Sequence, residues 1–470
     1  MKIKNFISYC VIAAATFGLA ACSDTDAQYT IPQVDAPVLV GSDPAEGSVV
    51  DDGDRVITLK FDKNIGFASA NYDKITLTGG GQVTKAIVYG TSKTLTISTT
   101  GTPKGAQCTL TIPAGLIYGP NKVTAPEITP NDSTKAPVPI DANPVMATSS
   151  KAVALYGYLK NNYGNGIISG MMASVAWNND ASEQVYQWTG KYPAINGYDY
   201  IHMPASVANA NWINYNDITP VKDWADNGGI VTIGWHWLVP KKKVEASTGG
   251  GAASAYSGLN PNTDYTYVPS ETEFDLKNAT VEGTWEKAFV DYDLANLAAY
   301  LKLLKDAGIP VLWRPLHEAA GGWFWWGTDA EAYKALWKYM FNYLKAEGFD
   351  NLIWVWTSQT GDDNWYPGDE YVDIVGRDLY GDNAASCANN YTTLFNKYSN
   401  KIVTLSECGW SEYTNSRVAN ISEQWESGAK WSWFMPWYDG SEAVNKHADE
   451  AWWKAAMELD YVITRDKVNF

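Results

Sequence analysis

The chain has 470 residues and a formal net charge of −17, from 52 Asp and Glu against 35 Lys and Arg. This acidic balance argues against nucleic acid and anionic lipid head groups as partners and suits a protein that handles neutral ligands. At roughly 150 residues per domain the length allows three domains, but a (β/α)₈ barrel alone takes about 250, so two folded units are favoured. All 22 tryptophans lie beyond residue 150, which indicates two units of different composition.

The five cysteines give no sign of a metal site or a disulfide framework. They have neither C-x-x-C spacing nor a histidine at metal-ligand spacing, so we expect neither a zinc site nor a disulfide framework. No metal ligand and no cofactor are predicted elsewhere in the chain. A disulfide between Cys387 and Cys408 stays open. The cysteines are Cys10, Cys22, Cys108, Cys387 and Cys408.

Residues 1–22 have the pattern of a secretion signal. Two lysines precede an apolar stretch from Phe6 to Ala21 that is too short for a spanning helix. The residues Leu19-Ala-Ala-Cys22 resemble a bacterial lipobox, which implies that Cys22 is lipidated. The acidic run that opens the tether, residues 23–36, is similar to export signals of surface lipoproteins in some gut bacteria, although a flexible tether also explains it. We therefore expect a lipid anchor on the outer membrane and exposure at the cell surface.

Residues 37–130 predict an antiparallel β-sandwich. Short alternating segments are separated by Gly and Pro breakers. The segments are Val56–Phe61, Ile75–Thr78, Ala86–Tyr89, Thr94–Ile97 and Thr109–Ile112. The run Asp43–Gly47, with Leu59–Phe61 and Ile112–Gly115 after it, resembles bacterial immunoglobulin-like modules. Without tryptophan or clustered acids the unit is interpreted as a spacer, and carbohydrate binding is the alternative. The tyrosines available for such binding are Tyr72, Tyr89 and Tyr118.

Residues 131–148 are rich in Pro, Asp and Ser and lack helical periodicity, so they are predicted to be a linker. From residue 149 to residue 470, strand-like and helix-like segments alternate. The eight strand candidates are Gly166–Met171, Ala194–Asp199, Ile230–Trp235, Ile309–Trp313, Leu352–Trp356, Val372–Gly376, Lys401–Leu405 and Trp431–Met435. This alternation predicts a (β/α)₈ barrel, an α/β fold, whose active groups follow the carboxyl ends of its strands. The nearly helix-free insertion at residues 240–285 is expected to form one wall of the cleft.

One stretch, residues 311–327, carries the chemistry. A buried strand, Val311–Trp313, ends near Arg314 because Pro315 cannot donate a further ladder hydrogen bond. A carboxylate, Glu318, and a cluster of indoles follow. A carboxylate beside aromatic faces is typical of proteins that hold and cleave sugar chains. The indoles are expected to divide between sugar platform and barrel packing, since at least one of them packs on the barrel.

Further polar and aromatic side chains follow the other strands. Two of these positions are ambiguous, since His236 could pack in the core instead and Asp378 could cap a helix. Asp199, at the end of the second strand, is ambiguous in the same way. The candidate substrate-binding residues are His236, Arg314, His317, Trp323, Trp326, Asp378, Tyr380 and Trp437.

Glu318 and Glu407 follow the fourth and seventh strands, whose ends face each other across an eight-strand ring. Two such carboxylates suit glycoside hydrolysis, with a separation of about 5–5.5 Å in retaining enzymes and about 6.5–9.5 Å in inverting ones. The acid must be protonated near neutral pH and the nucleophile ionised. Indoles should raise the pKa of Glu318, and donors such as Arg314 or Tyr380 should lower that of Glu407. We therefore assign Glu407 as the nucleophile.

These motifs resemble glycoside hydrolase family 26. The resemblance covers residues 149–470 and rests on Arg314-Pro-Leu-His-Glu318 with Gly321–Gly327, and on Leu405–Gly409, Gly234–Trp237 and Gly376–Tyr380. It implies a retaining endo-β-1,4-mannanase with Glu318 as acid/base and Glu407 as nucleophile. It also implies that His236, His317, Trp323 and Tyr380 contact the sugar near the cleaved bond.

Two departures from the family pattern concern the substrate. Ala320 and Tyr438 stand where many family mannanases have Asn and Arg, so the sugar subsites can differ while the catalytic pair is intact. A mixed-linkage β-glucanase or β-xylanase is the first alternative, and a non-catalytic surface glycan-binding protein is the second. The expected partners are a polysaccharide and other glycan-uptake proteins on the cell surface, with no nucleic acid, and we expect a monomer.

Overall fold

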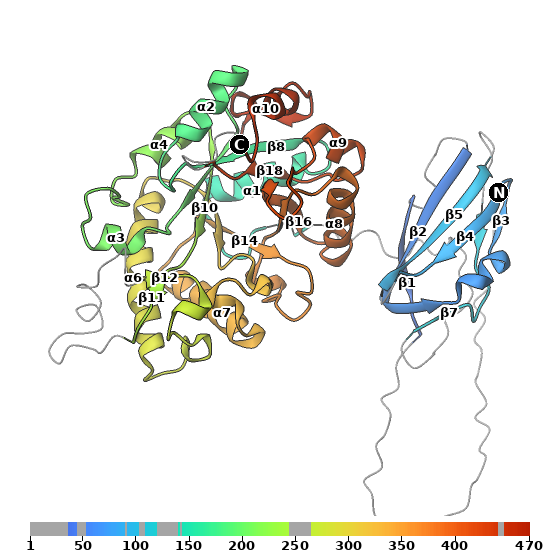
Figure 1. The fold of residues 1–470 in the computed structure, drawn as a ribbon, viewed down its shortest axis with the longest axis horizontal. Coiled ribbons are helices and arrows are strands. Elements are labelled where there is room, and N and C mark those ends of the chain that lie inside the picture. Colours follow the sequence, from blue (N-terminus) through green and yellow to red (C-terminus); the bar gives the residue numbers. More distant parts are fainter. Residues whose placement is uncertain are drawn as a thin grey trace, which may run out of the picture. The chain divides into compact units, whose positions relative to one another are not determined.

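The computed structural model describes residues 36–44, 53–89, 92–102, 109–119, 140–141, 143–243, 265–439 and 446–470. The chain divides into two compact units, Met1–Thr134 and Lys135–Phe470, both drawn in Figure 1. The predicted signal with Cys22, the tether as far as residue 35 and residues 131–139 of the predicted linker lie outside the described residues. Within the described part of the chain, no helix is long and apolar enough to cross a membrane.

The smaller unit consists of antiparallel strands around an apolar core, which confirms the predicted sandwich class. Its main sheet has the order β1–β2–β5–β4, with β7 paired to β2, and β3 pairs with β6. The strands are β1 Leu39–Asp43, β2 Gly53–Phe67, β3 Thr76–Thr78, β4 Gln82–Ile87, β5 Ser92–Thr102, β6 Thr109–Thr111 and β7 Ile117–Tyr118. Alternate residues of β2 and β5 face the core, for example Leu59, Phe61, Leu95 and Ile97, because successive strand side chains point to opposite faces.

The larger unit is a closed ring of eight parallel strands, which confirms the predicted (β/α)₈ barrel. The order is β15–β14–β13–β10–β9–β8–β18–β16, and pairing between β15 and β16 closes the ring. The strands are β8 Ile167–Met172, β9 Ile195–Asp199, β10 Ile230–Trp235, β13 Val311–Pro315, β14 Leu352–Ser358, β15 Ile374–Tyr380, β16 Ile402–Ser411 and β18 Trp433–Pro436. Each overlaps one of the eight predicted segments, because strands covered on both faces have continuous apolar runs.

Most helices lie around this ring, whereas α1 (Ser150–Asn162) packs on a cluster of residues that all eight strands contribute (Figure 1). The other described helices are α2 Asp180–Thr189, α3 Met203–Val207, α4 Thr219–Asp226, α6 Trp285–Asp306, α7 Ala330–Ala346, α8 Ala384–Lys397, α9 Ile421–Glu426 and α10 Glu450–Met457. Polar caps fix where several of them begin. The Asp329 side chain accepts hydrogen bonds from two backbone N–H groups in the first turn of α7. The Thr284 side chain accepts one from the backbone N–H of Lys287 in α6. Each cap satisfies donors that the first helical turn leaves unpaired.

The end of the predicted linker differs from expectation, because it packs on the barrel. Met146 is 6% exposed and belongs to the barrel core. The backbone N–H of Val145 donates to Asp373 at 2.6 Å, and Lys401 pairs with Asp141. Residues 140–141 and 143–148 are therefore part of the larger unit's packing rather than a free connection.

The remaining open points of the barrel concern its cysteines and its insertion. Cys387 and Cys408 are buried free thiols, so the disulfide left open above does not form in this structure.

In the insertion, residues 244–264 lie outside the described residues. Their flanks are paired as two short strands, β11 Val239–Pro240 and β12 Tyr265–Thr266, and β12 leads directly to the barrel mouth.

Candidate active site

Glu318 lies in a tight turn at the carboxyl end of β13. Leu316 and Glu318 have positive φ angles of 48° and 53°, and a short 3₁₀ helix, Ala319–Gly321, follows. Left-handed conformations of non-glycine residues cost of order 1–3 kcal/mol each and persist only where the surroundings hold them. Here the Tyr333 hydroxyl donates to the Leu316 carbonyl at 3.1 Å. The turn is therefore a fixed feature that sets the direction of the Glu318 side chain.

The carboxyl group of Glu318 is held by two donors, one for each oxygen. The Trp323 indole N–H donates to Oε2 at 3.0 Å, and the Gln359 side-chain amide donates to Oε1 at 3.0 Å. Gln359 comes one residue after the end of β14, the neighbouring strand in the ring. Adjacent strands thus fix the position of this carboxyl group.

Glu407 lies in β16 and is held by a buried arginine and a tyrosine. The Arg314 Nη1 donates to Oε1 at 2.5 Å, and the Tyr380 hydroxyl donates to Oε2 at 2.8 Å. The same guanidinium donates to Asp378 through Nη2 and to the Thr357 hydroxyl through Nε at 2.8 Å. Arg314 therefore uses its planar fork to orient two carboxylates at once.

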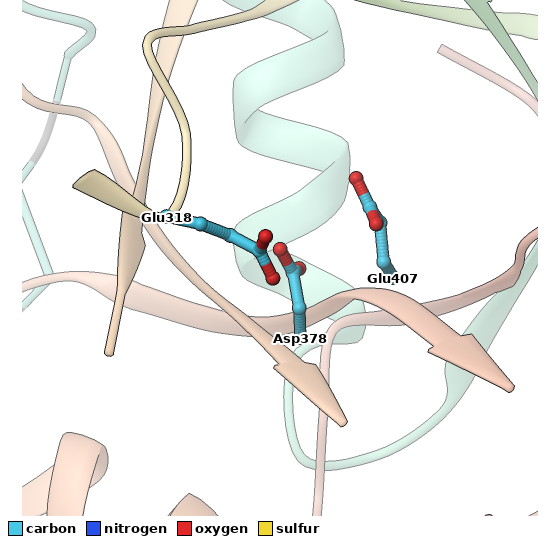
Figure 2. Close-up of side chains that lie close together, drawn as sticks. All are labelled: Glu318, Asp378 and Glu407. Atoms are coloured by element: carbon cyan, nitrogen blue, oxygen red, sulfur yellow. The ribbon is translucent and has the colours of Figure 1, made fainter. Parts of the chain in front are cut away.

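The carboxyl groups of Glu318, Asp378 and Glu407 converge at the mouth of the barrel (Figure 2). One oxygen from each lies within 4.8 Å of the others. This spacing matches the close pair of a retaining glycosidase and leaves less room than the roughly 6.5–9.5 Å of an inverting one. Among the described residues these oxygens are also close enough to share a cation, but Arg314 already neutralises two of the three groups.

The environments of the two glutamates differ in the direction that acid and nucleophile require. Burial, with the charges of Asp378 and Glu407 beside it, raises the pKa of Glu318 well above its usual range. Burial also raises the pKa of Glu407, but to a smaller extent, because Arg314 and His236 favour its ionised form. The donors predicted for Glu407 are therefore present. The predicted net lowering of its pKa is wrong, because desolvation outweighs them.

Two histidines and an aspartate extend the polar network. The Asp199 carboxylate accepts from the His236 backbone N–H at 3.0 Å and pairs with the His236 Nδ1. The His236 Nε2 lies 3.0 Å from the His317 Nε2. Burial lowers the pKa of His236, but the charge of Asp199 outweighs it and raises this pKa above its usual value. Burial and the neighbouring His236 hold the pKa of His317 well below its usual value. These directions favour a proton on His236 over one on His317. Because His236 contacts both Asp199 and His317 through its ring nitrogens, a purely apolar packing role for it is excluded.

A cavity of about 510 Å³ opens above the carboxylates. Seven of the ten candidate residues of the barrel line it: His236, His317, Glu318, Trp323, Tyr380, Glu407 and Trp437. The other three do not line it, and that they contact a sugar stays a prediction. The Arg314 side chain is 4% exposed and fully engaged by its partners, and that of Asp378 is wholly buried. Trp326 is 0% exposed, stacks on Phe324 at 4.4 Å and donates to the His317 carbonyl at 2.8 Å.

The sequence interpretation missed several residues of this site. Gln359 follows a strand end and could have been found by the same rule that located Glu318. Tyr267 comes from the insertion, which thereby supplies part of the cavity wall as predicted. No local pattern marks Met172, at the end of β8, or Ala176, Ile201 and His202, in the connections after β8 and β9. Tyr438, named above as a departure from the family pattern, also lines the cavity.

Comparison with known proteins agrees with this geometry. Residues 140–467 match the model of glycosyl hydrolase family 26. The chain belongs to this family. Residues 33–139 match a bacterial Ig-like domain model. The family 26 domain of an endo-β-mannanase/endo-β-glucanase from Prevotella bryantii is 43% identical, with a TM-score of 0.63, covering 70% of this chain and all of that one.

Two fungal proteins are similar at the level of sequence. A mannan endo-1,4-β-mannosidase of Thermothelomyces thermophilus is 31% identical over 69% of this chain and 62% of its own length. Mannan endo-1,4-β-mannosidase A of Piromyces sp is 31% identical over 64% of this chain and 45% of its own length. The chain thus spans less than two thirds of either relative.

Within the family 26 barrel, the arrangement brings together two carboxyl groups with different surroundings. Burial and the neighbouring carboxylates raise the pKa of Glu318 and so favour its protonated form. Glu407 receives charge-assisted and phenolic hydrogen bonds that orient its oxygens. These are the two groups that glycosyl transfer to water requires.

Proposed function

We propose that this family 26 chain is an endo-acting retaining β-mannanase that cleaves β-1,4-mannosidic bonds in galactomannan or glucomannan. The observation that carries the proposal is the Glu318–Glu407 pair, whose oxygens lie within 4.8 Å and whose pKa values are raised to unequal extents. The substrate class is supported by relatives named for mannan, four of which are 31% identical.

The reaction proceeds as a double displacement. In the first step a Glu407 oxygen bonds to the anomeric carbon while the bond to the leaving sugar breaks, and Glu318 gives its proton to the departing oxygen. In the second step Glu318 takes a proton from water, whose oxygen attacks the anomeric carbon and releases Glu407. Two inversions give net retention, and both carboxyl groups return to their starting protonation states.

The distinguishing experiment uses three polymers: galactomannan, lichenan and xylan. Reducing ends released from galactomannan alone support the proposal. Release from lichenan or xylan alone names one of the alternative substrates, and release from none favours a glycan-binding role. NMR of the first product distinguishes the mechanisms, because an inverted anomeric signal contradicts double displacement.

We also propose that the chain is a lipoprotein of the outer membrane, displayed at the cell surface, with the Ig-like unit as a spacer. The support is the lysine-led apolar stretch, the lipobox-like Leu19–Cys22 and the acidic run after it. Labelled palmitate should enter the wild-type chain and not Cys22→Ala. Protease treatment of intact cells should remove the barrel, and its survival under those conditions contradicts surface exposure.

A further inference from the structure

Exposed tryptophan is rare in this protein and is confined to one neighbourhood. All 22 tryptophans lie in the described part of the chain, and only Trp212 and Trp323 are exposed, at 48% and 46%. Trp323 lines the cavity and donates to Glu318. Exposing a large apolar ring to water is unfavourable, and one of the two exposed rings lines a cavity. The other, Trp212, is therefore also a candidate for ligand binding.

Trp212 adjoins the same cavity from a different strand. It lies between α3 and α4, in the connection that follows β9, and its ring centroid is 4.5 Å from that of His202 at an interplanar angle of 71°. His202 itself lines the cavity. Trp212 therefore packs directly against a residue of the cavity lining without belonging to that lining itself.

The segment that carries Trp212 is fixed to the catalytic network. Tyr215 is fully buried, and its hydroxyl donates to the Asp199 carbonyl at 2.7 Å and accepts from the His202 backbone N–H at 3.1 Å. Its own backbone N–H donates to the Ser206 side chain at 3.0 Å. Because Asp199 also holds His236, Trp212 is positioned relative to the carboxylates without further ordering on binding, which limits the entropy cost.

We propose that Trp212, packed against His202, forms a distal sugar-binding subsite for the β-1,4-linked chain. This inference rests on the proposed function for its ligand class. Trp323 contacts the acid that protonates the leaving sugar, so the leaving side of the chain lies at Trp323. Trp212 stands on a different connection, beside His202, so its subsite lies apart from the one at Trp323. The indole face packs on the apolar C–H face of a sugar ring.

The test measures binding separately from turnover. In full-length protein carrying Glu407→Gln, which keeps an amide in place of the proposed nucleophile, calorimetry measures the Kd of mannotriose and mannohexaose. Adding Trp212→Ala should weaken mannohexaose binding about tenfold and leave mannotriose unchanged, because the shorter ligand fills the central cavity alone. Trp212→Phe should restore part of the loss. Tyr186→Ala, a control on α2 whose ring is 42% exposed, should change neither Kd.

Three outcomes overturn the subsite: an unchanged mannohexaose Kd, an equal loss for both oligosaccharides, or no binding of either one before Trp212 is changed. Turnover of galactomannan by the wild-type chain reports on the proposed function independently. A wild-type chain that leaves galactomannan intact, but whose mannohexaose affinity depends on Trp212, refutes the activity and supports the subsite.

Discussion

Arg314 and Glu407 are joined by a 2.5 Å hydrogen bond between Nη1 and Oε1, with both side chains almost fully buried. The bond connects strand β13, which Glu318 follows, with strand β16, which contains Glu407. Burying two charges is costly unless the geometry is good and the remaining groups are satisfied. Here the other guanidinium nitrogens are also bonded, so the pair orients Glu407 and favours its ionised form.

Replacing Arg314 with lysine should move the acid limb of the pH–kcat/KM profile to higher pH. Arg314 favours the ionised form of Glu407, and the shorter, single-headed ammonium cannot reach Glu407, Asp378 and Thr357 together. The pKa of Glu407 then rises, so a higher pH is needed to ionise it. An acid limb that stays in place shows that another group controls this ionisation. Unfolding in urea, measured in parallel, separates the pH effect from lost stability.

The two glutamates should respond differently to replacement by glutamine. Glu407→Gln removes the attacking oxygen, so turnover should fall more than about a thousandfold on every substrate. Glu318→Gln removes the proton donor of the first step and the base of the second, each of which contributes about 10²–10⁴-fold. Aryl mannosides whose leaving groups need no protonation avoid the first loss, so part of the activity should survive on them. Steady-state kinetics on galactomannan and on an aryl mannobioside test this contrast. Equal losses for both variants on the aryl substrate contradict the assigned roles.

The sequence predicted the barrel and its catalytic pair for one physical reason: strands buried on both faces have continuous apolar runs, and the carboxyl ends of parallel strands meet at one mouth. Glu318 and Glu407 could be found in this way although 89 positions separate them. Which indoles are exposed at the cavity and which are buried in the barrel could not be predicted in this way. Trp323 and Trp326 are of one residue type and three positions apart, but the first is exposed and the second wholly buried.

That division depends on backbone conformation. The left-handed φ angles at Leu316, Glu318 and Gly322 set how the segment turns, and nothing in its residue types specifies the two at non-glycine positions. The net pKa of Glu407 was missed for a related reason. The sequence revealed its donors but not the depth of its burial, which is a property of the whole ring.

Trp323 and Trp326 can therefore be compared directly, because the same substitution removes an exposed ring at one position and a buried ring at the other. Trp326→Ala removes a wholly buried ring that stacks on Phe324 and should reduce the free energy of unfolding by about 3–5 kcal/mol. Trp323→Ala should reduce it by less than about 1 kcal/mol, because 46% of that residue is exposed, but should lower kcat/KM by removing a donor from Glu318. Urea unfolding and kinetics on both variants check the two effects. A large stability loss at Trp323 contradicts the division.

Replacing Gln359 with leucine tests whether this residue affects the pKa of Glu318, the proposed acid. The Gln359 amide donates to Glu318 Oε1 at 3.0 Å, and a donor of this kind favours the ionised carboxylate. Its loss should raise the pKa of Glu318 further, so the proton is retained to higher pH and the basic limb of the kcat/KM profile moves upward. Gln184→Leu, on the exposed face of α2, is the control and should leave the profile unchanged. A basic limb that moves downward in Gln359→Leu shows that the amide instead stabilises the protonated form, and an unmoved limb assigns that limb to another group.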